Sequence, residues 1–433
     1  MANQQGKTDA AWAEILEAHP DIVETIEAGE VYRIRAAEIK RFREPRLMTK
    51  HDTSESVPGP LKKHSINVLP LSRSEYALCD FKLFEPFPDT SILRPKLCSL
   101  PDFETLTIDN ITSESNAINA LIAGGILDDF LGTENTIETF NGRMGTGDFS
   151  FSVDCAHGAP VSIDVKGAQL EIDGGFENDE SVIIMEAKNV IHNDFHVRQL
   201  YFPFRKYHAF VTKPIRLVFS QYTNLTYHLF EYEFVDPYNY NSLQLLRKDA
   251  YTFEDARITT TELYDVWQTT PVAFDDNQER TSIPFIQADK FDRVISLMEQ
   301  LSRTEDGSMT TDQVTQFMGT VQRQAAYYPA AGEYLGLFER ERGVTSLTPK
   351  AREILKLGLR DRQLAFARLM FRHEVFHKLF GRIFETGSIP EIAEAVTVML
   401  ELNVCNGGAT VRRRAQTVCA WLRWIMSLVD EEE

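Results

Sequence analysis

The chain has 433 residues, 43% of them hydrophobic and 25% charged, which is typical of a globular protein with about two to four domains. No leader with a cleavage site follows Met1 and no apolar run approaches the roughly 18 residues of a membrane span, so we expect neither secretion nor membrane insertion and predict a cytoplasmic protein. The formal net charge of −19 is unusual for a DNA-binding protein, because affinity for phosphates comes mainly from lysine and arginine, so DNA binding would depend on local basic surfaces.

The first 63 residues predict a helical N-terminal appendage. Residues 10–28 and 34–45 have amphipathic helical patterns, interrupted at His19-Pro20, and the polar connector HDTSESVPGPLKKH follows as a hinge. Between Tyr32 and Lys63, nine lysines and arginines stand against four acids. This stretch is a candidate basic surface, although solubility alone also explains it.

Residues 64–285 predict the main domain. Prolines in residues 66–101 indicate loops and short strands, and residues 113–131 predict a helix. The segment NGRMGTGDFSFSV predicts a glycine-rich turn that enters a strand, where Arg143 is a candidate DNA contact. No G-x-x-x-x-G-K-[ST] sequence occurs, so ATP-driven activity is not supported.

The run SVIIMEAKN predicts a strand that carries an acid and a lysine on one face. Side chains alternate along a strand, so Glu186 and Lys188 share a face with Ile184, while Met185 and Ala187 point the other way. Such a pair is common on solvated strands and contributes little to stability there. Here it follows a strongly apolar run that predicts a buried strand, where a charge without a partner is costly.

The preceding strand brings a second acid to the same place. It ends at Gly174-Gly175, and Asn178 with Asp179 predicts a turn, so the hairpin returns Asp173 to the side of Glu186. Two converging carboxylates and a backbone carbonyl suit Mg²⁺, which prefers oxygen ligands. Such an ion polarises a phosphoryl oxygen and lowers the pKa of a bound water, and a nearby lysine orients that water or offsets charge. The implied chemistry is phosphodiester hydrolysis.

These residues resemble a known family. Asp173, a spacer, and Glu186-x-Lys188 at a strand end resemble the PD-(D/E)XK nucleases, with Ile172 where a proline usually precedes the first acid. The wider pattern, from EIDGGFE through MEAKN to DFHVRQLYFPFR, looks like type II restriction endonucleases and covers about residues 100–235. The resemblance implies Asp173 and Glu186 as metal ligands and Lys188 as the residue that orients water.

Two further acids are candidates for the same site. Glu171 shares a strand face with Asp173 and could share the metal, or it is a surface carboxylate. Glu114 matches the helical acid that many family members place near the metal, but it also fits a first-turn glutamate that favours the helix dipole.

The segment after the catalytic strand is basic and rich in aromatic residues. From Phe195 to Phe230 it contains no acid. We expect DNA contacts from Arg198, Gln199, Arg205 and Lys206, with solubility as the competing explanation. The runs IRLVFSQYT and LTYHLFEYEFV then alternate as strands do.

Residues 286–360 predict a winged-helix domain. FDRVISLMEQL, MTTDQVTQFMG and TVQRQAAYYPAAGEYLGL predict three helices, and ERERGVTSLTPKAREIL predicts a two-stranded wing followed by a helix, a junction that resembles winged-helix domains. The third helix is a natural major-groove reader. Its candidate contacts to bases or phosphates are Thr320, Gln322, Arg323 and Gln324.

An internal similarity predicts a second such unit in residues 361–433. The 17 residues from Gly319 align without gaps to those from Ala409, with five identities at a constant offset of 90. The corresponding candidate contacts are Arg412, Arg413 and Arg414. Helical amphipathicity alone could supply some identities, and winged helices also serve as dimer or protein contacts.

Two other functions remain open. The sequence HEVFH, with His373, Glu374 and His377, has the form of a zincin motif, with Glu385, Glu391 or Glu394 as a third zinc ligand, so a metalloprotease is one alternative. A DNA-binding regulator with a decayed nuclease core is the other.

The five cysteines do not predict a metal site or a disulfide framework. They are odd in number, scattered, and lack a C-x-x-C pair: Cys79, Cys98, Cys155, Cys405 and Cys419. We expect buried, reduced thiols.

Together these patterns predict an α+β fold, with a mixed-sheet PD-(D/E)XK nuclease core flanked by helices, a helical N-terminal appendage and tandem C-terminal winged-helix-like domains. The expected domains are residues 1–63, 64–285, 286–360 and 361–433. The implied function is a Mg²⁺-dependent type II restriction-like endonuclease that cuts double-stranded DNA at a specific site, with dependence on base methylation left open. We expect a homodimer where that site is palindromic, a cognate DNA methyltransferase in the same system, and no membrane partner.

Overall fold

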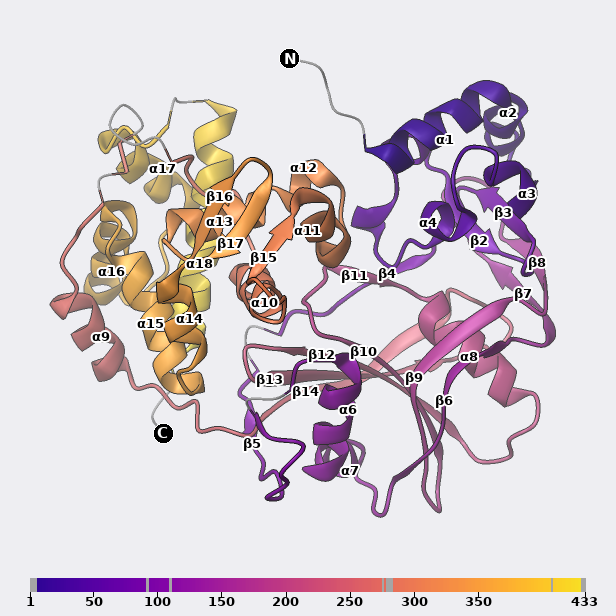
Figure 1. Ribbon diagram of the computed structural model, residues 1–433, viewed down its shortest axis with the longest axis horizontal. Coiled ribbons are helices and arrows are strands. Elements are labelled where there is room, and N and C mark those ends of the chain that lie inside the picture. The colour runs from indigo at the N-terminus through magenta and orange to yellow at the C-terminus, as the bar shows by residue number, and fades with distance from the viewer. Residues whose placement is uncertain are drawn as a thin grey trace.

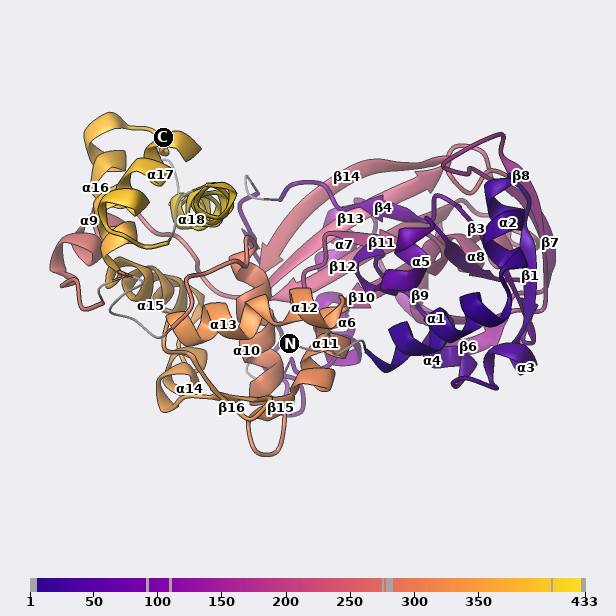
Figure 2. The same cartoon turned by 90° about the horizontal axis from the view of Figure 1, so that it is seen from above.

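The computed structural model describes residues 6–90, 93–108, 111–274, 276–277, 283–405 and 408–429. The fold is mixed α+β, with a seven-stranded mixed sheet as its largest sheet (Figure 1). Figure 2 shows an elongated molecule with the C-terminal helices at one end and the N-terminal elements at the other.

The N-terminal unit, residues 7–79, contains both helices and strands. Its elements are α1 (Lys7–Ala18), α2 (Asp21–Glu27), β1 (Tyr32–Arg35), α3 (Ala36–Ile39), α4 (Pro45–Thr49), the 3₁₀ helix η1 (Ser54–Ser56), α5 (Gly59–Lys63), β2 (Asn67–Pro70) and β3 (Glu75–Cys79). The strands form an antiparallel sheet in the order β1-β3-β2.

The prediction of a helix over residues 34–45 is therefore wrong for residues 34 and 35, which belong to β1. Ile34 is 2% exposed between exposed Arg33 and Arg35, and this alternation pairs β1 with β3 instead of starting a helix. The appendage is thus not purely helical, and its sheet continues past residue 63.

The connector that we expected to be a hinge is packed between units. The Thr53 hydroxyl donates to the Gly319 carbonyl at 2.5 Å, and Glu55 forms an ion pair of 2.9 Å with Arg293, whose side chain is fully buried. A buried ion pair is costly to break, so these contacts hold the N-terminal unit against the C-terminal unit.

The core unit, residues 84–252, contains the large sheet. Its elements are β4 (Phe84–Pro86), β5 (Lys96–Leu97), α6 (Glu114–Ala123), α7 (Ile126–Leu131), β6 (Ile137–Gly145), β7 (Asp148–Val153), β8 (Val161–Lys166), β9 (Gln169–Glu177), β10 (Val182–Lys188), β11 (Asp194–His196), α8 (Arg198–His208), β12 (Ile215–Thr223), β13 (Thr226–Phe234) and β14 (Leu243–Thr252). The sheet order is β5-β14-β13-β12-β10-β9-β6, and β7-β8 and β11-β4 form separate pairs.

The central strand β10 is covered on both faces. It runs antiparallel to β9 and parallel to β12, and α8 makes the crossover between β10 and β12. Ile184 belongs to the hydrophobic cluster that contains residues of α8, whereas Met185 and Ala187 belong to the cluster beneath α6 and α7. The predicted alternation along this strand is confirmed.

The C-terminal unit, residues 260–427, is mostly helical. Its elements are α9 (Thr260–Thr269), α10 (Phe291–Ser302), β15 (Ser308–Thr310), α11 (Thr311–Met318), α12 (Gln322–Ala325), α13 (Tyr327–Tyr334), β16 (Phe338–Glu341), β17 (Val344–Leu347), α14 (Pro349–Leu355), α15 (Leu359–Phe371), α16 (Glu374–Thr386), α17 (Ile392–Glu401) and α18 (Ala409–Ser427). A small antiparallel sheet has the order β15-β17-β16.

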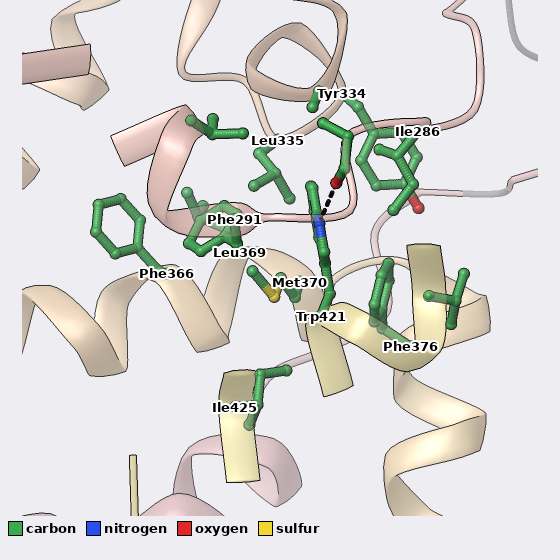
Figure 3. Close-up of a cluster of buried hydrophobic side chains, with 14 of the residues drawn as sticks. Ile286, Phe291, Tyr334, Leu335, Phe366, Leu369, Met370, Phe376, Trp421 and Ile425 are labelled. Carbon is green, nitrogen blue, oxygen red and sulfur yellow. Dashed lines mark hydrogen bonds between the residues drawn. The ribbon is translucent and has the colours of Figure 1, made fainter. Parts of the chain in front are cut away.

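The two C-terminal domains that we expected share one hydrophobic core. Trp421 of α18 stacks on Phe376, packs against Phe291 of α10 and donates its indole N–H to the Ala288 carbonyl at 2.7 Å (Figure 3). One cluster of buried residues runs from Ile258 to Val429. Residues 286–360 and 361–429 are therefore packed as one body.

The expected second winged-helix unit has no wing in the part of 361–429 that the structure describes. This region forms the helices α15 to α18 without a strand. The aligned segments also differ, because residues after Gly319 form two short helices whereas those after Gly408 form one 19-residue helix. The shared pattern reflects helical amphipathicity rather than a repeated unit.

Candidate active site

The site begins at the end of the β9–β10 hairpin. The strands pair with Val182 opposite Glu177 and Met185 opposite Gly174, so Asp173 and Glu186 follow side by side where the ladder ends. There the Asp173 carboxylate accepts the N–H of Ala187 at 3.0 Å. This contact satisfies a backbone donor of the central strand and fixes the direction of the carboxylate.

The predicted hairpin is present with its turn at Asn178 and Asp179 as expected, but the first strand continues past Gly174-Gly175 to Glu177. Gly174 and Gly175 are within β9, and the turn is made by residues 178–181, where Asn178 accepts the N–H groups of Glu180 and Ser181. A side chain at Gly175 would collide with Phe140, because an added Cβ would lie 2.1 Å from its ring. Close approach of a ring, and not a turn, explains this glycine.

Lys188 lies among three carboxylates. Its Nζ is 2.6 Å from Glu186, 3.6 Å from Asp173 and 3.8 Å from Glu114, and it also donates to the Ala187 carbonyl at 2.9 Å. We call these four side chains, Glu114, Asp173, Glu186 and Lys188, the Lys188 cluster. Burial opposes the charge of Lys188, but the surrounding acids raise its pKa well above the usual value.

Glu186 is the most buried acid of the Lys188 cluster. It is 7% exposed and accepts a second hydrogen bond from the Gln199 amide of α8 at 2.5 Å. Burial raises its pKa to about 8, against the opposing effect of Lys188 and with a contribution from Asp173. A buried carboxyl of this kind releases its proton readily only when more positive charge is near.

The donor atoms of the Lys188 cluster are oxygens, the type that a hard divalent cation prefers, but the three carboxylates do not all lie within 4.8 Å of one another. Three carboxylates and the Ala187 carbonyl surround a single ammonium group, which stands between the acids. The acids outnumber the lysine, and oxygen ligands are those that Mg²⁺ prefers. Asp173 and Glu186 are the residues that would hold such an ion.

Asp52 is a further acid near this site that the sequence did not predict. Burial opposes its charge, but Lys50, Lys188 and Arg198 together lower the pKa of Asp52. Its Oδ1 is buried and has no hydrogen-bond partner among the described residues. Asp52 lies in the connector that we took for a hinge, and nothing in the local pattern relates it to β10.

Other buried polar atoms without partners gather around the same place. Among the residues that the structure describes, these include His51 Nε2, Asp52 Oδ1, Asn189 Oδ1, His192 Nδ1 and Arg198 Nε. Buried polar groups are normally paired, so a concentration of unpaired ones indicates a place for a ligand or for water.

The Lys188 cluster borders a large cleft. The cleft has a volume of about 2230 Å³ and is lined by Lys188 and Glu114 of the core unit, by α1 and α4 of the N-terminal unit, and by α11 and α12 of the C-terminal unit. In Figure 1, α1 and α4 lie on the opposite side from α11 and α12. All three units therefore contribute to one concave surface.

The cleft is strongly basic although the chain is acidic. Among the described residues that line it, eleven are lysine or arginine and four are acids. The basic residues are Lys7, Arg43, Arg46, Lys50, Lys62, Lys63, Lys188, Arg303, Arg323, Arg340 and Arg413. A cleft lined by one sign of charge attracts a polyanion.

Five of the candidate DNA contacts line this cleft: Thr320, Gln322, Arg323, Gln324 and Arg413. Arg323 and Gln324 are exposed. Thr320 is 5% exposed and donates its hydroxyl to Gln324 at 2.7 Å, so it positions that side chain. Arg413 lies over the ring of Tyr327 and donates to Gln287.

The candidates on α8 do not line the cleft. Arg205 is 8% exposed and donates to the Ser150 carbonyl and to the Tyr201 hydroxyl. Lys206 donates to the Gly145 carbonyl at 2.8 Å. Arg198 lies over the ring of Phe202, and Gln199 is bound to Glu186. These contacts tie the four side chains to other groups of the core unit, away from the described lining of the cleft.

The remaining candidates also lie elsewhere. Glu171 and Arg143 form an exposed ion pair of 2.9 Å between β9 and β6, and no contact of Glu171 with the Lys188 cluster is seen among the described residues. On α18, Arg414 donates to the Phe285 carbonyl and Arg412 is exposed. Glu171 is thus the surface carboxylate that we considered as its alternative role.

The HEVFH segment does not form a metal site in the described part of the chain. His373 precedes α16 and its Nδ1 lies 2.9 Å from Asp276, while His377 packs on the ring of Trp267. Among the described residues, only Cys79, Asp80 and Cys155 bring three His, Cys, Asp or Glu ligand atoms within 4.8 Å of one another. This geometry does not support a zinc protease.

Three segments of the chain are similar to protein families of undefined role. Residues 9–78, 79–252 and 293–430 match domains of unknown function, DUF6996, DUF6997 and DUF7226 respectively. No curated protein and no solved structure matches the chain. Over the part of the chain that the structure describes, no helix has both the length and the apolar character needed to cross a lipid bilayer.

Proposed function

We propose that this chain is a Mg²⁺-dependent endonuclease of the type II restriction-like kind, which hydrolyses phosphodiester bonds of double-stranded DNA. The observation that carries the proposal is the position of the Lys188 cluster. Its Glu114 and Lys188 line a basic cleft to which all three units contribute, and Asp173 and Glu186 lie directly behind them, against Lys188. A scissile phosphate bound in this cleft would lie beside groups suited to its hydrolysis.

The residues of the Lys188 cluster have distinct roles in this mechanism. Asp173 and Glu186 would hold Mg²⁺, which when bound stabilises negative charge on the phosphate and acidifies a water molecule. Lys188 orients the attacking water and balances charge as it develops. The amide of Gln199 and the N–H of Ala187 hold the two carboxylates in place, and this rigidity lowers the reorganisation needed for reaction.

The C-terminal unit supplies recognition in this proposal. Its first part runs α10, β15, α11, α12, α13, β16 and β17, which fits the winged-helix order that we expected, and the strands form one antiparallel sheet. Arg323 and Gln324 of α12 are exposed in the cleft, and their side chains suit guanine and adenine edges. The cut of both strands at a palindromic site would require a homodimer.

A cleavage assay tests the proposal. The purified protein is incubated with methylated and unmethylated plasmid DNA, with and without Mg²⁺. We expect discrete fragments that require Mg²⁺ and that disappear in Glu186→Ala and Lys188→Ala. The control variant is Glu171→Gln, which removes an exposed acid of the same hairpin that lies outside the Lys188 cluster. Binding without cleavage under every condition would instead support a DNA-binding regulator.

A further inference from the structure

A second group of metal-ligating side chains lies where the N-terminal unit meets the core unit. Cys79 ends β3, Asp80 follows it, and Cys155 and His157 belong to the loop after β7. We call these four side chains the Cys79 cluster. Cys79, Asp80 and Cys155 are all buried, and the loop is joined to β3 by the hydrogen bond from Ala156 N–H to the Asp80 carbonyl.

The distances within the Cys79 cluster fit tetrahedral zinc. The two sulfur atoms lie 3.8 Å apart. Two thiolates on one tetrahedral zinc, each bound at about 2.3 Å, lie about 3.8 Å apart. Asp80 Oδ1 lies 3.5 Å from Cys79 Sγ, and a thiolate and a carboxylate on the same ion would be separated by about 3.6 Å. The ring Nδ1 of His157 lies 2.9 Å from the other oxygen of Asp80.

The negative charge of the buried Asp80 side chain also favours a cation beside it. Its side chain is 6% exposed, and its partners are the N–H and ring nitrogen of His157 and the thiol of Cys79. Within the described residues, neither lysine nor arginine pairs with it. A buried carboxylate beside two thiols is costly unless it is paired or coordinates a metal.

We propose that Cys79, Asp80 and Cys155 bind one structural zinc ion that fastens the N-terminal unit to the core unit, while the ring nitrogen of His157 holds the Asp80 carboxylate in place. The two sulfur ligands favour zinc over magnesium. The two cysteines are 76 positions apart, so the ion would close a long loop and act much as a disulfide does. The ligands also stand at the boundary between two family matches, which meet at residues 78 and 79.

Elemental analysis of the full-length protein tests this site. Protein is purified without chelators and then dialysed against metal-free buffer. We expect about one zinc per chain in the wild type, and a loss of zinc in Cys79→Ser and Cys155→Ser. The matched control is Cys98→Ser, because Cys98 is partly buried in another part of the core unit. Glu186→Gln should keep its zinc, which separates the Cys79 cluster from the Lys188 cluster.

Cobalt substitution keeps the proposal testable if a serine variant does not fold. Wild-type protein with Co²⁺ in place of zinc should show the intense visible bands of a tetrahedral site and a sulfur-to-cobalt charge-transfer band. His157→Ala should retain the charge-transfer band but lose metal faster to a competing chelator. Wild-type protein without zinc and without that band, or with a Cys79–Cys155 disulfide in its intact mass, would overturn the proposal.

Discussion

The Lys188 cluster and the Cys79 cluster both gather ionisable side chains at the ends of strands, but their chemistry differs. The first offers oxygen atoms and a lysine and borders the basic cleft. The second offers two sulfurs, a carboxylate and an imidazole, and it joins β3 to the loop after β7. Hard oxygen donors beside a wide cleft favour exchange of ligands and catalysis, whereas sulfur donors in a closed junction favour a permanent ion.

The balance of charged side chains also differs between the two clusters, and this difference separates a catalytic role from a structural one. In the Lys188 cluster, three acids surround one ammonium group, so in our proposal a cation would bind there without being needed for folding. In the Cys79 cluster, the described contacts of Asp80 include no lysine or arginine. We therefore expect removal of a ligand to reduce activity in the first case and stability in the second.

The largest expected effect is that of Glu186→Gln on cleavage. The substitution keeps the shape and removes the charge that would hold Mg²⁺, so we expect roughly a hundredfold to thousandfold slower cleavage. DNA binding in the absence of Mg²⁺ and the unfolding temperature should stay near those of the wild type. Cys155→Ser should show the reverse pattern, with a lower unfolding temperature and cleavage within about tenfold where it remains folded. Cleavage at the wild-type rate in Glu186→Gln would contradict a catalytic role for the Lys188 cluster.

Lowering the pH should reduce the stability of the fold through His192, which lies near the Lys188 cluster. His192 follows β10 and is 7% exposed, and burial, with Arg293 and Lys188, lowers its pKa to about 3 from 6.5. Between these values the unfolded chain binds more protons than the folded one, so stability is present above pH 6.5 and is lost as the pH falls.

Denaturant unfolding at two pH values measures this loss. Between pH 7 and pH 4.5 the wild type should lose on the order of 2 kcal/mol more than His192→Gln, which cannot be protonated. His208→Gln is the control, because His208 is exposed on α8. Equal losses in the wild type and His192→Gln would show that folding does not lower the pKa of His192.

Gln199→Ala should reduce activity by a smaller factor. Gln199 contributes a hydrogen bond to Glu186 at 2.5 Å without being a metal ligand in the proposal. Partners of this kind change metal affinity or activity by about tenfold or more. We expect the Mg²⁺ concentration for half-maximal cleavage to rise about tenfold, with partial recovery at saturating Mg²⁺. A lower maximal rate with an unchanged Mg²⁺ requirement would place Gln199 outside metal binding.

The sequence predicted that Asp173, Glu186 and Lys188 lie together because this depends only on residues that are close in the chain. The alternation of Ile184, Glu186 and Lys188 with Met185 needs only the geometry of a strand, and the hairpin to Asp173 spans few residues. Glu114 was predicted from the family resemblance, which implies a helical acid near the metal, and Lys188 does lie 3.8 Å from it. Whether these residues carry out catalysis remains a prediction.

The sequence could not predict features that depend on distant contacts. Asp52 and the Cys79 cluster come together only through the packing of the N-terminal unit, and no spacing motif relates Cys79 to Cys155. The similarity between residues after Gly319 and those after Ala409 was misleading, because amphipathic helices share patterns whatever their partners. Trp421 packs against α10 in the same core, which no local pattern shows.

The smallest expected effect is that of removing a single charge from the cleft. Of the two clusters, the Lys188 cluster borders this cleft and the Cys79 cluster does not. Arg323 is exposed there, so Arg323→Ala should weaken DNA binding by about threefold at low salt and reduce the salt dependence by about one phosphate contact. Arg412→Ala removes an equal charge from an exposed position outside the cleft and should change neither quantity. Both variants should keep their zinc, because neither residue contacts the Cys79 cluster. Equal effects of the two variants would mean that net charge, and not the cleft, governs binding.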